Sequence, residues 1–397
     1  MKSNSLKIIA FILFYNISLS QPKDTIYGKI KSIREQLIFL DENRQNLKLF
    51  STEGDYGHNG FLSEEYTKSR FNIWWYKTYW VHYINYYKEF NNNNRLLKVV
   101  WYYKDQSILS SCENKYDISG KIINQEFNSY KLSKTVNQYD ENNNLILSKN
   151  IDSNKNYSTT KRDFNKKNQI IREEYFNSEY PKEKRITEYY YDLSGNLIEL
   201  KNFDEYGKNY GTKFEYDKKN RKTKIINHSP FIWVKTKTGS HQKRTKNGND
   251  QISTEFKYDE KNRIIETKSY NPNFNDGNII EFSGKEVTIY ENDLIKNIYF
   301  YDNKDSLTYY KTFEYDNLNR KTKDYSISPK YPDSNITLEY FYNETEYPTK
   351  LLYLEKGITT QVDFEYVFDN NKNWIEQIKS VNGKKLYIWK RELEYFD

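Results

Sequence analysis

Hydrophobic and polar residues alternate in short stretches along most of this chain. Residues 213–216 read Lys-Phe-Glu-Tyr and residues 312–315 read Thr-Phe-Glu-Tyr, and residues 255–258 and 363–366 follow the same pattern. A period of two places the aromatic side chains on one face of an extended strand and the polar side chains on the other. The pattern therefore predicts half-buried β-strands.

Each of these strands ends at an aromatic residue, and a tight turn follows. In the clearest copies, the aromatic residue is a Tyr and the turn begins with an Asp. The Asp side chain can accept a hydrogen bond from the backbone N–H two residues further on, and a later Gly or Asn tolerates the left-handed backbone conformation. A second apolar strand follows, so each copy predicts a β-hairpin. The clearest copies give the predicted structural turn residues: Tyr191, Asp192, Gly195, Tyr216, Asp217, Asn220, Tyr258, Asp259, Asn262, Tyr315, Asp316 and Asn319, with Gly120, Asn144 and Asn168 expected to take the left-handed conformation in looser copies.

The hairpin phrase recurs at a nearly constant spacing. From Tyr191 to Tyr216 it returns after 25 residues, and longer steps occur only around Tyr258. Periods in this range indicate a stacked array of one small unit, because a single hairpin cannot bury a core alone. Looser copies begin at Phe90, Tyr116, Tyr139, Phe164, Tyr290, Tyr342 and Phe368. We therefore predict an all-β chain whose hairpin repeats span residues 89–397.

The phrase resembles the YD repeat of RHS-type proteins, whose core is a Tyr-Asp pair, two variable residues, Gly-Asn or Gly-Arg, and an apolar strand. Residues 191–197 (Tyr-Asp-Leu-Ser-Gly-Asn-Leu) fit it closely, although most copies carry Asn where the family prefers Gly. In that family the repeats wind into a spiral sheet that forms a shell around a toxic C-terminal domain. The resemblance implies a solitary repeat module without a toxin domain. Because the chain is far shorter than such a shell, we predict an open, curved array of stacked hairpins.

The N-terminal residues differ from the repeats. Residues 1–20 have the pattern of an export signal, with two lysines before an apolar run at residues 8–15 and small residues before the expected cleavage site. That run is too short to remain in a bilayer as a spanning helix. We therefore expect an exported protein without a membrane span, located in a periplasm, on the cell surface or outside the cell. Residues 21–88 fit the repeat poorly and are predicted to form an N-terminal cap on the array.

Composition agrees with a thin sheet. Aromatic residues make up 17% of the chain, which contains 40 Tyr. A Tyr ring can pack while its hydroxyl stays near water, so Tyr suits a sheet with little core. The formal net charge is +7, a mild excess of 62 basic over 55 acidic residues. No basic run is joined to a recognised binding motif, so we expect no nucleic-acid partner.

The sequence lacks catalytic and metal-binding motifs. The four His residues show no ligand spacing, and we find no P-loop, dinucleotide fingerprint or Gly-x-Ser-x-Gly elbow. We therefore expect no metal, no cofactor and no enzymatic activity. The single cysteine, Cys112, excludes an intrachain disulfide and is predicted to be a buried structural thiol. Asp55 and His58 could form an acid–base pair, but we favour a simple turn in which Asp55 caps the backbone.

The densest aromatic stretch lies in the predicted cap and supplies the candidate binding residues Trp74, Trp75, Tyr76, Tyr79 and Trp80. One interpretation is a stacking platform for sugar rings, whose apolar faces bind flat against indoles. The other is a hydrophobic plug that seals the first hairpin. We favour the plug, because aromatic residues on both faces of a strand suit a segment that is buried on both sides.

The sequence thus predicts an exported, noncatalytic repeat protein that binds a protein or a polysaccharide at the cell envelope or outside the cell. Repeat arrays offer extended surface, and nothing in the sequence assembles a reaction centre. One alternative is a glycan-active hydrolase whose carboxylates lie near the aromatic stretch. Another is an accessory of an RHS-type toxin system, which only the resemblance implies. The oligomeric state stays open.

Overall fold

The computed structural model describes residues 25–40, 48–49, 80–81, 84–103, 105–129, 131–203, 209–236, 239–273 and 279–397. Apart from the short 3-10 helix η5 (Pro332–Ser334), every regular element in these residues is a β-strand. The strands of the N-terminal half are β1 (Ile30–Phe39), β2 (Lys48–Leu49), β3 (Trp80–Val81), β4 (Asn85–Phe90), β5 (Leu96–Tyr102), β6 (Ile108–Tyr116), β7 (Ile122–Asn128), β8 (Leu132–Tyr139), β9 (Leu145–Asp152), β10 (Tyr157–Phe164), β11 (Ile170–Asn177), β12 (Arg185–Tyr191) and β13 (Leu197–Phe203). Those of the C-terminal half are β14 (Asn209–Tyr216), β15 (Lys222–Thr236), β16 (Gly239–Tyr258), β17 (Ile264–Asn273), β18 (Ile279–Glu291), β19 (Leu294–Tyr301), β20 (Leu307–Tyr315), β21 (Lys321–Ile327), β22 (Ile336–Tyr342), β23 (Pro348–Glu355), β24 (Ile358–Phe368), β25 (Trp374–Val381) and β26 (Lys384–Tyr395).

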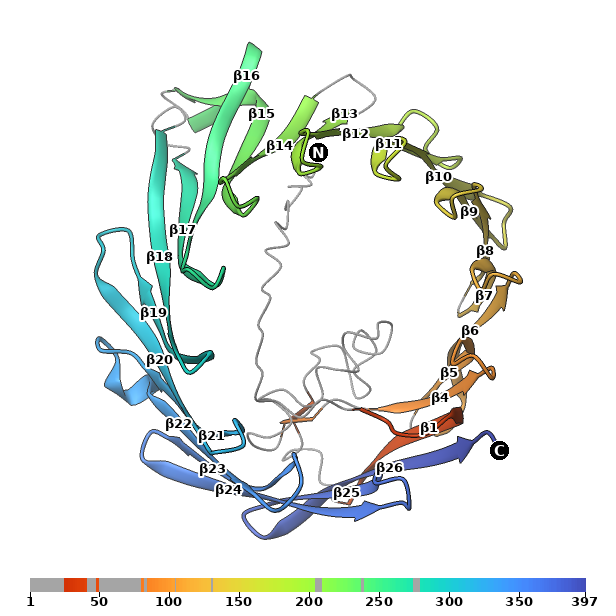
Figure 1. Ribbon diagram of the computed structural model, residues 1–397, viewed down its shortest axis with the longest axis vertical. Helices are drawn as coiled ribbons and strands as arrows, with labels where there is room; N and C mark the ends of the chain where they lie inside the picture. The colour runs from red at the N-terminus through yellow and green to blue at the C-terminus, as the bar shows by residue number, and fades with distance from the viewer. Residues whose placement is uncertain are drawn as a thin grey trace.

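Twenty-four of these strands form one closed antiparallel sheet. From β4 to β26 each strand pairs with its neighbours in the sequence, and β1 lies between the two ends of that series. Ile33 of β1 is opposite Leu393 of β26 on one side and opposite Lys88 of β4 on the other. Figure 1 shows the resulting ring. The remaining strands, β2 and β3, form a separate parallel pair.

The prediction of an all-β chain of hairpins is confirmed, but the prediction of an open array is wrong. The sheet closes because β1, which belongs to the stretch predicted to be a cap, hydrogen-bonds to both edges that an open array would leave exposed. Unpaired strand edges carry rows of unsatisfied backbone N–H and C=O groups, so closure removes two such rows at once. The alternation in β1 is hard to recognise, because charged Glu35 occupies one of its inward positions.

The hairpin turns share one local geometry. In the copy at Asp217, the Asp carboxylate accepts hydrogen bonds from the backbone N–H groups of Lys219 (2.8 Å) and Arg221 (3.0 Å). Asn220 takes the left-handed conformation with φ of 58°. The same left-handed position falls on Gly120, Asn168, Gly195, Asn262 and Asn319 in other copies. In the copy that begins at Tyr139, it falls on Asn143 and not on Asn144, so that assignment is corrected.

Tyrosine hydroxyls link each hairpin to the one before it. The Tyr at the end of a hairpin's first strand donates a hydrogen bond to a carbonyl at the start of the preceding hairpin's second strand; for Tyr216 the acceptor is Leu197, at 2.9 Å. The same bond is made by Tyr116, Tyr139, Tyr191, Tyr258, Tyr290, Tyr315 and Tyr342. In β24, which ends at Phe368, Tyr366 donates the corresponding bond from two residues before the strand end. The repeated Tyr therefore joins neighbouring repeats through its ring and its hydroxyl together.

Replacing Tyr216 by Phe removes this bond and keeps the ring. We expect the free energy of unfolding to fall by about 1 kcal/mol, the usual contribution of one such hydrogen bond. The matched control is Tyr190→Phe in the neighbouring hairpin, where the hydroxyl bonds only the exposed Glu188 carboxylate. Urea unfolding measures both variants. An equal loss in the two would contradict a linking role for the Tyr216 hydroxyl.

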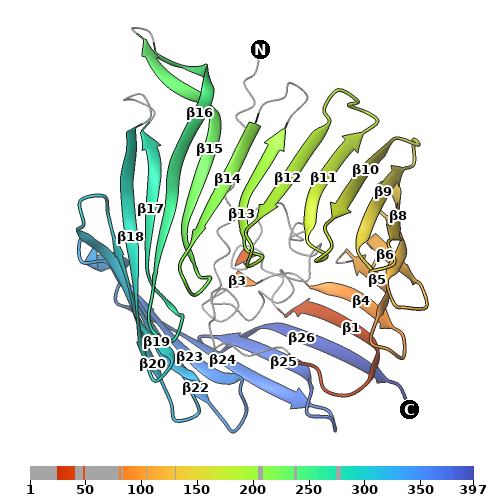
Figure 2. The same ribbon diagram turned by 45° about the horizontal axis from the view of Figure 1, so that its top comes forward.

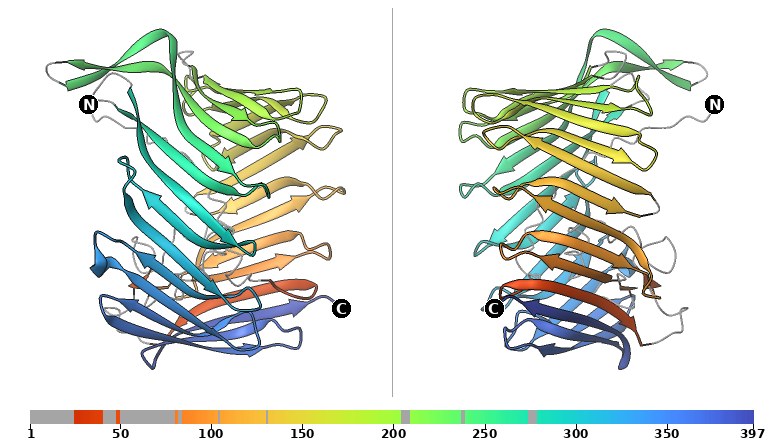
Figure 3. Two further views of the ribbon diagram at one scale, coloured as in Figure 1. Left: turned by 60° about the vertical axis from the view of Figure 1, so that its left-hand side comes forward. Right: turned by 90° about the vertical axis from the view of Figure 1, so that its right-hand side faces the viewer.

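The register separates an inward and an outward face of the ring. Directly opposite residues on paired strands share a face, so one face can be followed from strand to strand. Leu37, Leu351 and Trp389 share one face and are fully buried, and no described strand lies outside the ring to cover them from there (Figures 1 and 3). This face is therefore the inward face. Its buried core spans β22 to β26, β1 and β4.

The outward face is charged at alternate positions. Cross-strand ion pairs lie along it, such as Lys98 with Glu113 at 2.7 Å, Lys257 with Glu266 at 2.8 Å, and Lys323 with Glu339 at 3.2 Å. Such exposed pairs add little to stability, but charged side chains on a sheet surface prevent association with other sheets. The outward face thus presents charged side chains of both signs to water.

Candidate functional site

The inward face has two different parts, of which the first is a closed polar core where the ring is joined. Arg391 on β26 lies opposite Glu35 on β1, and its Nε donates a hydrogen bond to the Glu35 carboxylate at 2.9 Å. The indole N–H of Trp389 donates to the other carboxylate oxygen, also at 2.9 Å. The guanidinium group lies 3.7 Å from the ring centroid of Trp374. We call Glu35, Trp374, Trp389 and Arg391 the seam cluster.

The seam cluster is inaccessible to a ligand. The side chains of Glu35 and Arg391 are both 0% exposed. Lys379 on the adjoining strand β25 is also fully buried, and burial holds the pKa of its amine well below the usual value. Polar groups buried in this way must be paired, because an unpaired charge in the interior is costly. The cluster therefore joins the first and last strands of the sheet and does not form a binding site.

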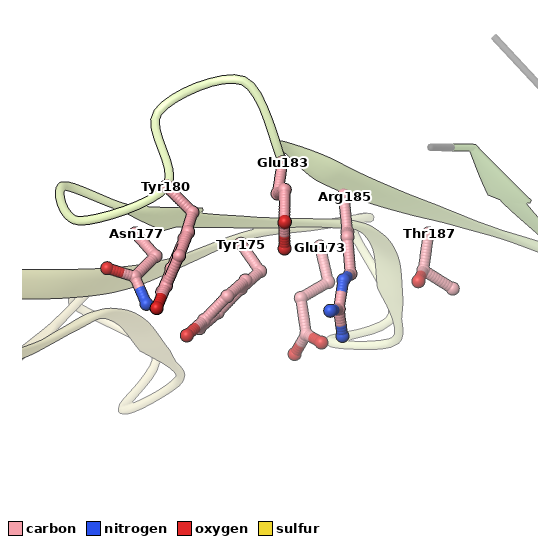
Figure 4. A pocket seen from close by; sticks show the side chains of 7 residues that line it. All are labelled: Glu173, Tyr175, Asn177, Tyr180, Glu183, Arg185 and Thr187. Atoms are coloured by element: carbon pink, nitrogen blue, oxygen red, sulfur yellow. The ribbon is translucent and has the colours of Figure 1, made fainter. Parts of the chain in front are cut away.

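The second part of the inward face is an open groove across β11 and β12. It has a volume of about 490 Å³ and is lined by Glu173, Tyr175, Asn177, Tyr180, Glu183, Arg185 and Thr187. We call it the inward groove. Figure 4 shows these seven side chains projecting to the same side of the ribbon. By register, its five strand residues lie on the face that continues into the buried core.

Strand alternation and one loop position the groove residues. Positions 173, 175 and 177 of β11 share one face because the period of a strand is two, and positions 185 and 187 of β12 share it by pairing. The β11–β12 loop adds Tyr180 and Glu183. It is held by hydrogen bonds from the backbone N–H of residue 183 to the carbonyl of residue 180 (2.9 Å) and from the N–H of residue 179 to the Asn177 side chain (2.9 Å). The Tyr180 side chain stays 54% exposed.

The groove combines aromatic rings with charged groups of both signs. Glu173 is held by Arg162 of β10, whose Nε lies 2.7 Å from its carboxylate. The Arg185 guanidinium lies 5.9 Å from the centroid of Tyr175, within the range of a cation–π contact. Among the described residues, no carboxylate lies within ion-pair distance of Arg185. Its guanidinium donors are therefore available to a ligand that enters the groove.

The groove offers recognition chemistry. Its Tyr, Asn, Thr, Glu and Arg side chains can donate and accept hydrogen bonds, and two phenol rings can contact apolar ligand surface. The arrangement suits binding.

The predicted site residues either lie away from the inward groove or fall outside the residues that the structure describes. Trp74, Trp75, Tyr76 and Tyr79 lie outside the described residues, as do Asp55 and His58. Only the backbone of Trp80 is described, in β3 opposite Lys48 of β2. The predicted turn residues lie at the hairpin ends and bond the chain to itself.

Cys112 on β6 is less buried than the sequence predicted. The Cys112 thiol is half-buried, its Sγ lies 3.7 Å from Asn114 Oδ1, and burial raises the pKa of the thiol. A raised pKa keeps the less reactive protonated form at neutral pH. Among the described residues, no group of three His, Cys, Asp or Glu side chains could hold a metal ion. No described helix is long and apolar enough to cross a membrane.

Sequence reasoning missed all seven residues of the inward groove. A signal existed: Glu173, Tyr175 and Asn177 stand at alternate positions of one predicted strand and therefore share a face. Recognising it requires knowing which face of the strand turns inward. Arg185 and Thr187 give no signal of their own, because only pairing with β11 brings them beside that row.

Comparisons with known proteins do not assign the chain to a family. No family model and no curated protein matches it. Similar solved structures include the Photorhabdus luminescens Tc holotoxin pore with a mutated TccC3, at a TM-score of 0.40 and 11% identity over 90% of this chain and 19% of that chain. A TcdB2–TccC3 structure has a TM-score of 0.18 and 11% identity, over 74% of this chain and 22% of the other.

A porin-like protein from Bacteroides uniformis is also similar, with a TM-score of 0.21 and 9% identity over 68% of this chain and 91% of that protein. This chain spans about a fifth of the two toxin chains. TM-scores of 0.40 and below are too low for any of these structures to identify the fold or the function. The description of the closed sheet therefore rests on its own strand pairing.

Proposed function

We propose that this protein is an exported, noncatalytic binding protein, and that its inward groove holds a polysaccharide. The observation that carries the proposal is the groove itself: an open, aromatic and polar site on the inward face, across the ring from the closed core (Figure 1). Residues 1–20 carry the export pattern that would bring the protein to the cell envelope or beyond it.

The chemistry of the groove favours a sugar chain over a protein partner. A stable protein interface buries about 800 Å² on each partner and is anchored by a compact apolar centre. The inward groove is narrower and mixes Tyr rings with amide, hydroxyl, carboxylate and guanidinium groups. Tyr175 and Tyr180 can pack on the apolar faces of sugar rings, while Asn177 and Thr187 bond their hydroxyl groups. The available Arg185 adds a donor for a hydroxyl or carboxylate of the ligand.

The alternative of a glycan-active hydrolase has one observation in its favour. Two carboxylates, Glu173 and Glu183, line the same groove, and paired carboxylates are what glycosidases use. The ion pair with Arg162 engages Glu173, and the binding proposal expects no turnover. The toxin-accessory alternative has no observation of this kind and rests on resemblance alone.

The proposal is tested by calorimetric titration of the protein with fractionated envelope and extracellular polysaccharides. We expect saturable binding to one fraction, with at least a tenfold loss of affinity in Tyr175→Ala and in Arg185→Ala, since truncating a central contact residue costs more than about 1.4 kcal/mol. Tyr190→Ala is the matched control, because Tyr190 lies on the outward face of β12, the strand that carries Arg185.

Two results would oppose the proposal. Binding that survives in both groove variants would locate the ligand elsewhere on the molecule. Release of shorter saccharides, abolished by Glu173→Gln or Glu183→Gln in a folded protein, would establish the hydrolase instead.

A further inference from the structure

The hairpin formed by β15 and β16 extends beyond the ring. Pairing between β14 and β15 ends at Gly211 opposite His228, and pairing between β16 and β17 begins at Thr254 opposite Ser269. Between these points, residues 229–236 and 239–249 pair only with each other among the described residues. We call them the projecting ribbon. Figures 2 and 3 show it leaving the rim of the sheet.

The base of the ribbon is fixed by specific contacts. Asp250 accepts a hydrogen bond from Lys213 at 2.7 Å and lies 2.6 Å from the His228 ring nitrogen, across the β15–β16 pair. Gly248 has a φ of 69°, and a side chain there would meet the His228 ring at 2.3 Å. A register shift between Ser229 and Phe231 follows directly, which bends the ribbon away from the sheet. The ribbon therefore projects from a base that is held by specific side-chain contacts.

The ribbon has a composition unlike that of the ring. Its residues 231–236 and 239–247 include four basic and no acidic residues, whereas the ring alternates both signs. The basic positions are Lys235, Lys243, Arg244 and Lys246. Four consecutive apolar residues occupy positions 231–234 of the first strand of the ribbon. In the strand register, Phe231 is opposite Arg244 and Ile232 is opposite Lys243.

We propose that the projecting ribbon docks on an anionic phospholipid surface. A cluster of four or more basic residues is attracted to anionic headgroups, and each contributes about fivefold in affinity near the surface. Apolar and aromatic residues among the basic ones add burial at the headgroup boundary, where Trp is the preferred side chain. Both outer edges of the ribbon lack strand partners among the described residues, so a surface can approach it from either side.

The apolar run distinguishes a lipid surface from a soluble polyanion. A polyanion in water is held by charge alone, and four consecutive apolar residues on a projecting ribbon would then gain nothing from contact with it. A lipid surface rewards both features at once, because its anionic headgroups attract basic residues and its boundary layer accepts apolar ones. Attachment through a projecting ribbon would leave the ring and its inward groove free.

The test is sedimentation of the protein with phosphatidylcholine vesicles prepared with and without phosphatidylglycerol. We expect binding only to the anionic vesicles, and a fall of about 100-fold in the triple variant Lys243→Glu, Arg244→Glu, Lys246→Glu. The charge-matched control is Lys166→Glu, Lys218→Glu, Lys219→Glu, which places the same reversal on exposed turns of the ring and should weaken binding far less. Ile232→Ser with Trp233→Ser should weaken binding most at high salt, where the apolar contribution dominates.

Several outcomes would overturn the proposal. One is equal binding to neutral vesicles, and another is an equal loss in the ribbon and control variants. Binding to dextran sulfate without binding to anionic vesicles would replace the lipid surface by a soluble polyanion. The groove variant Tyr175→Ala should bind vesicles as the unmodified protein does, so failure of the polysaccharide proposal and failure of this one are separately visible.

Discussion

Replacing Arg391 by Ala is expected to lower the free energy of unfolding by about 3–5 kcal/mol. The substitution leaves the Glu35 carboxylate fully buried without its guanidinium partner, and removing one member of a buried ion pair costs far more than the pair contributes. It also removes the cation that packs on Trp374 at 3.7 Å. The transition in guanidinium chloride measures the loss.

A double replacement separates the charge effect from the loss of packing. In the variant Glu35→Leu, Arg391→Met both buried charges disappear and most of the volume remains, so stability should return close to that of the unmodified protein. A matched exposed control is Lys98→Ala, which breaks an ion pair with Glu113 on the outward face and should cost less than about 1 kcal/mol. An equal fall in the free energy of unfolding in Arg391→Ala and Lys98→Ala would show that the seam cluster does not hold the ring closed.

Replacing Trp389 by Ala should also cost about 3–5 kcal/mol, for a different reason. The indole is 0% exposed, lies opposite Leu37 of β1, and packs edge-on against Trp374 with ring centroids 4.9 Å apart. Truncation would leave a cavity on the inward face where the first and last strands meet. Thermal unfolding followed by circular dichroism should show a lower midpoint.

Trp389→Phe isolates the polar part of that effect. Phe keeps most of the apolar contact but lacks the N–H that donates to Glu35 at 2.9 Å. The free energy of unfolding of Trp389→Phe should therefore lie between those of the unmodified protein and Trp389→Ala. Trp389→Ala should also speed amide hydrogen exchange where the first and last strands meet. The amides of β1 and β26 should then exchange before those of the strands on the far side of the ring. Uniform exchange in all strands would indicate that the ring does not open at this point.

Closure bears directly on the proposed binding function. A closed ring fixes the curvature of the inward face, so the row on β11 and the residues on β12 converge on one side of the sheet. An open array of the same hairpins could flatten, and the groove residues would then no longer converge on a common ligand. Variants that open the seam should therefore weaken polysaccharide binding even though the groove and the seam cluster lie on different strands.

The sequence by itself determined the hairpins, because their geometry is local. Asp217, Lys219 and Arg221 lie within five residues of one another, and the hydrogen bonds that form the turn connect only these residues. The period of the phrase likewise predicts the order of strands, since an antiparallel strand pairs most easily with the strand next to it in the chain. These parts of the fold need no knowledge of distant residues.

Closure, the face of each strand that turns inward, and the inward groove became visible only in the tertiary structure. Glu35 and Arg391 are 356 positions apart, and no local pattern indicates that a strand with an inward carboxylate belongs between the two ends of the sheet. Alternation shows that two faces differ, but it cannot show which one turns inward, so Glu173, Tyr175 and Arg185 could not be grouped in advance. The physical reason is range: turns form from hydrogen bonds between near neighbours, whereas closure and the groove arise from pairing and packing between residues that the sequence holds far apart.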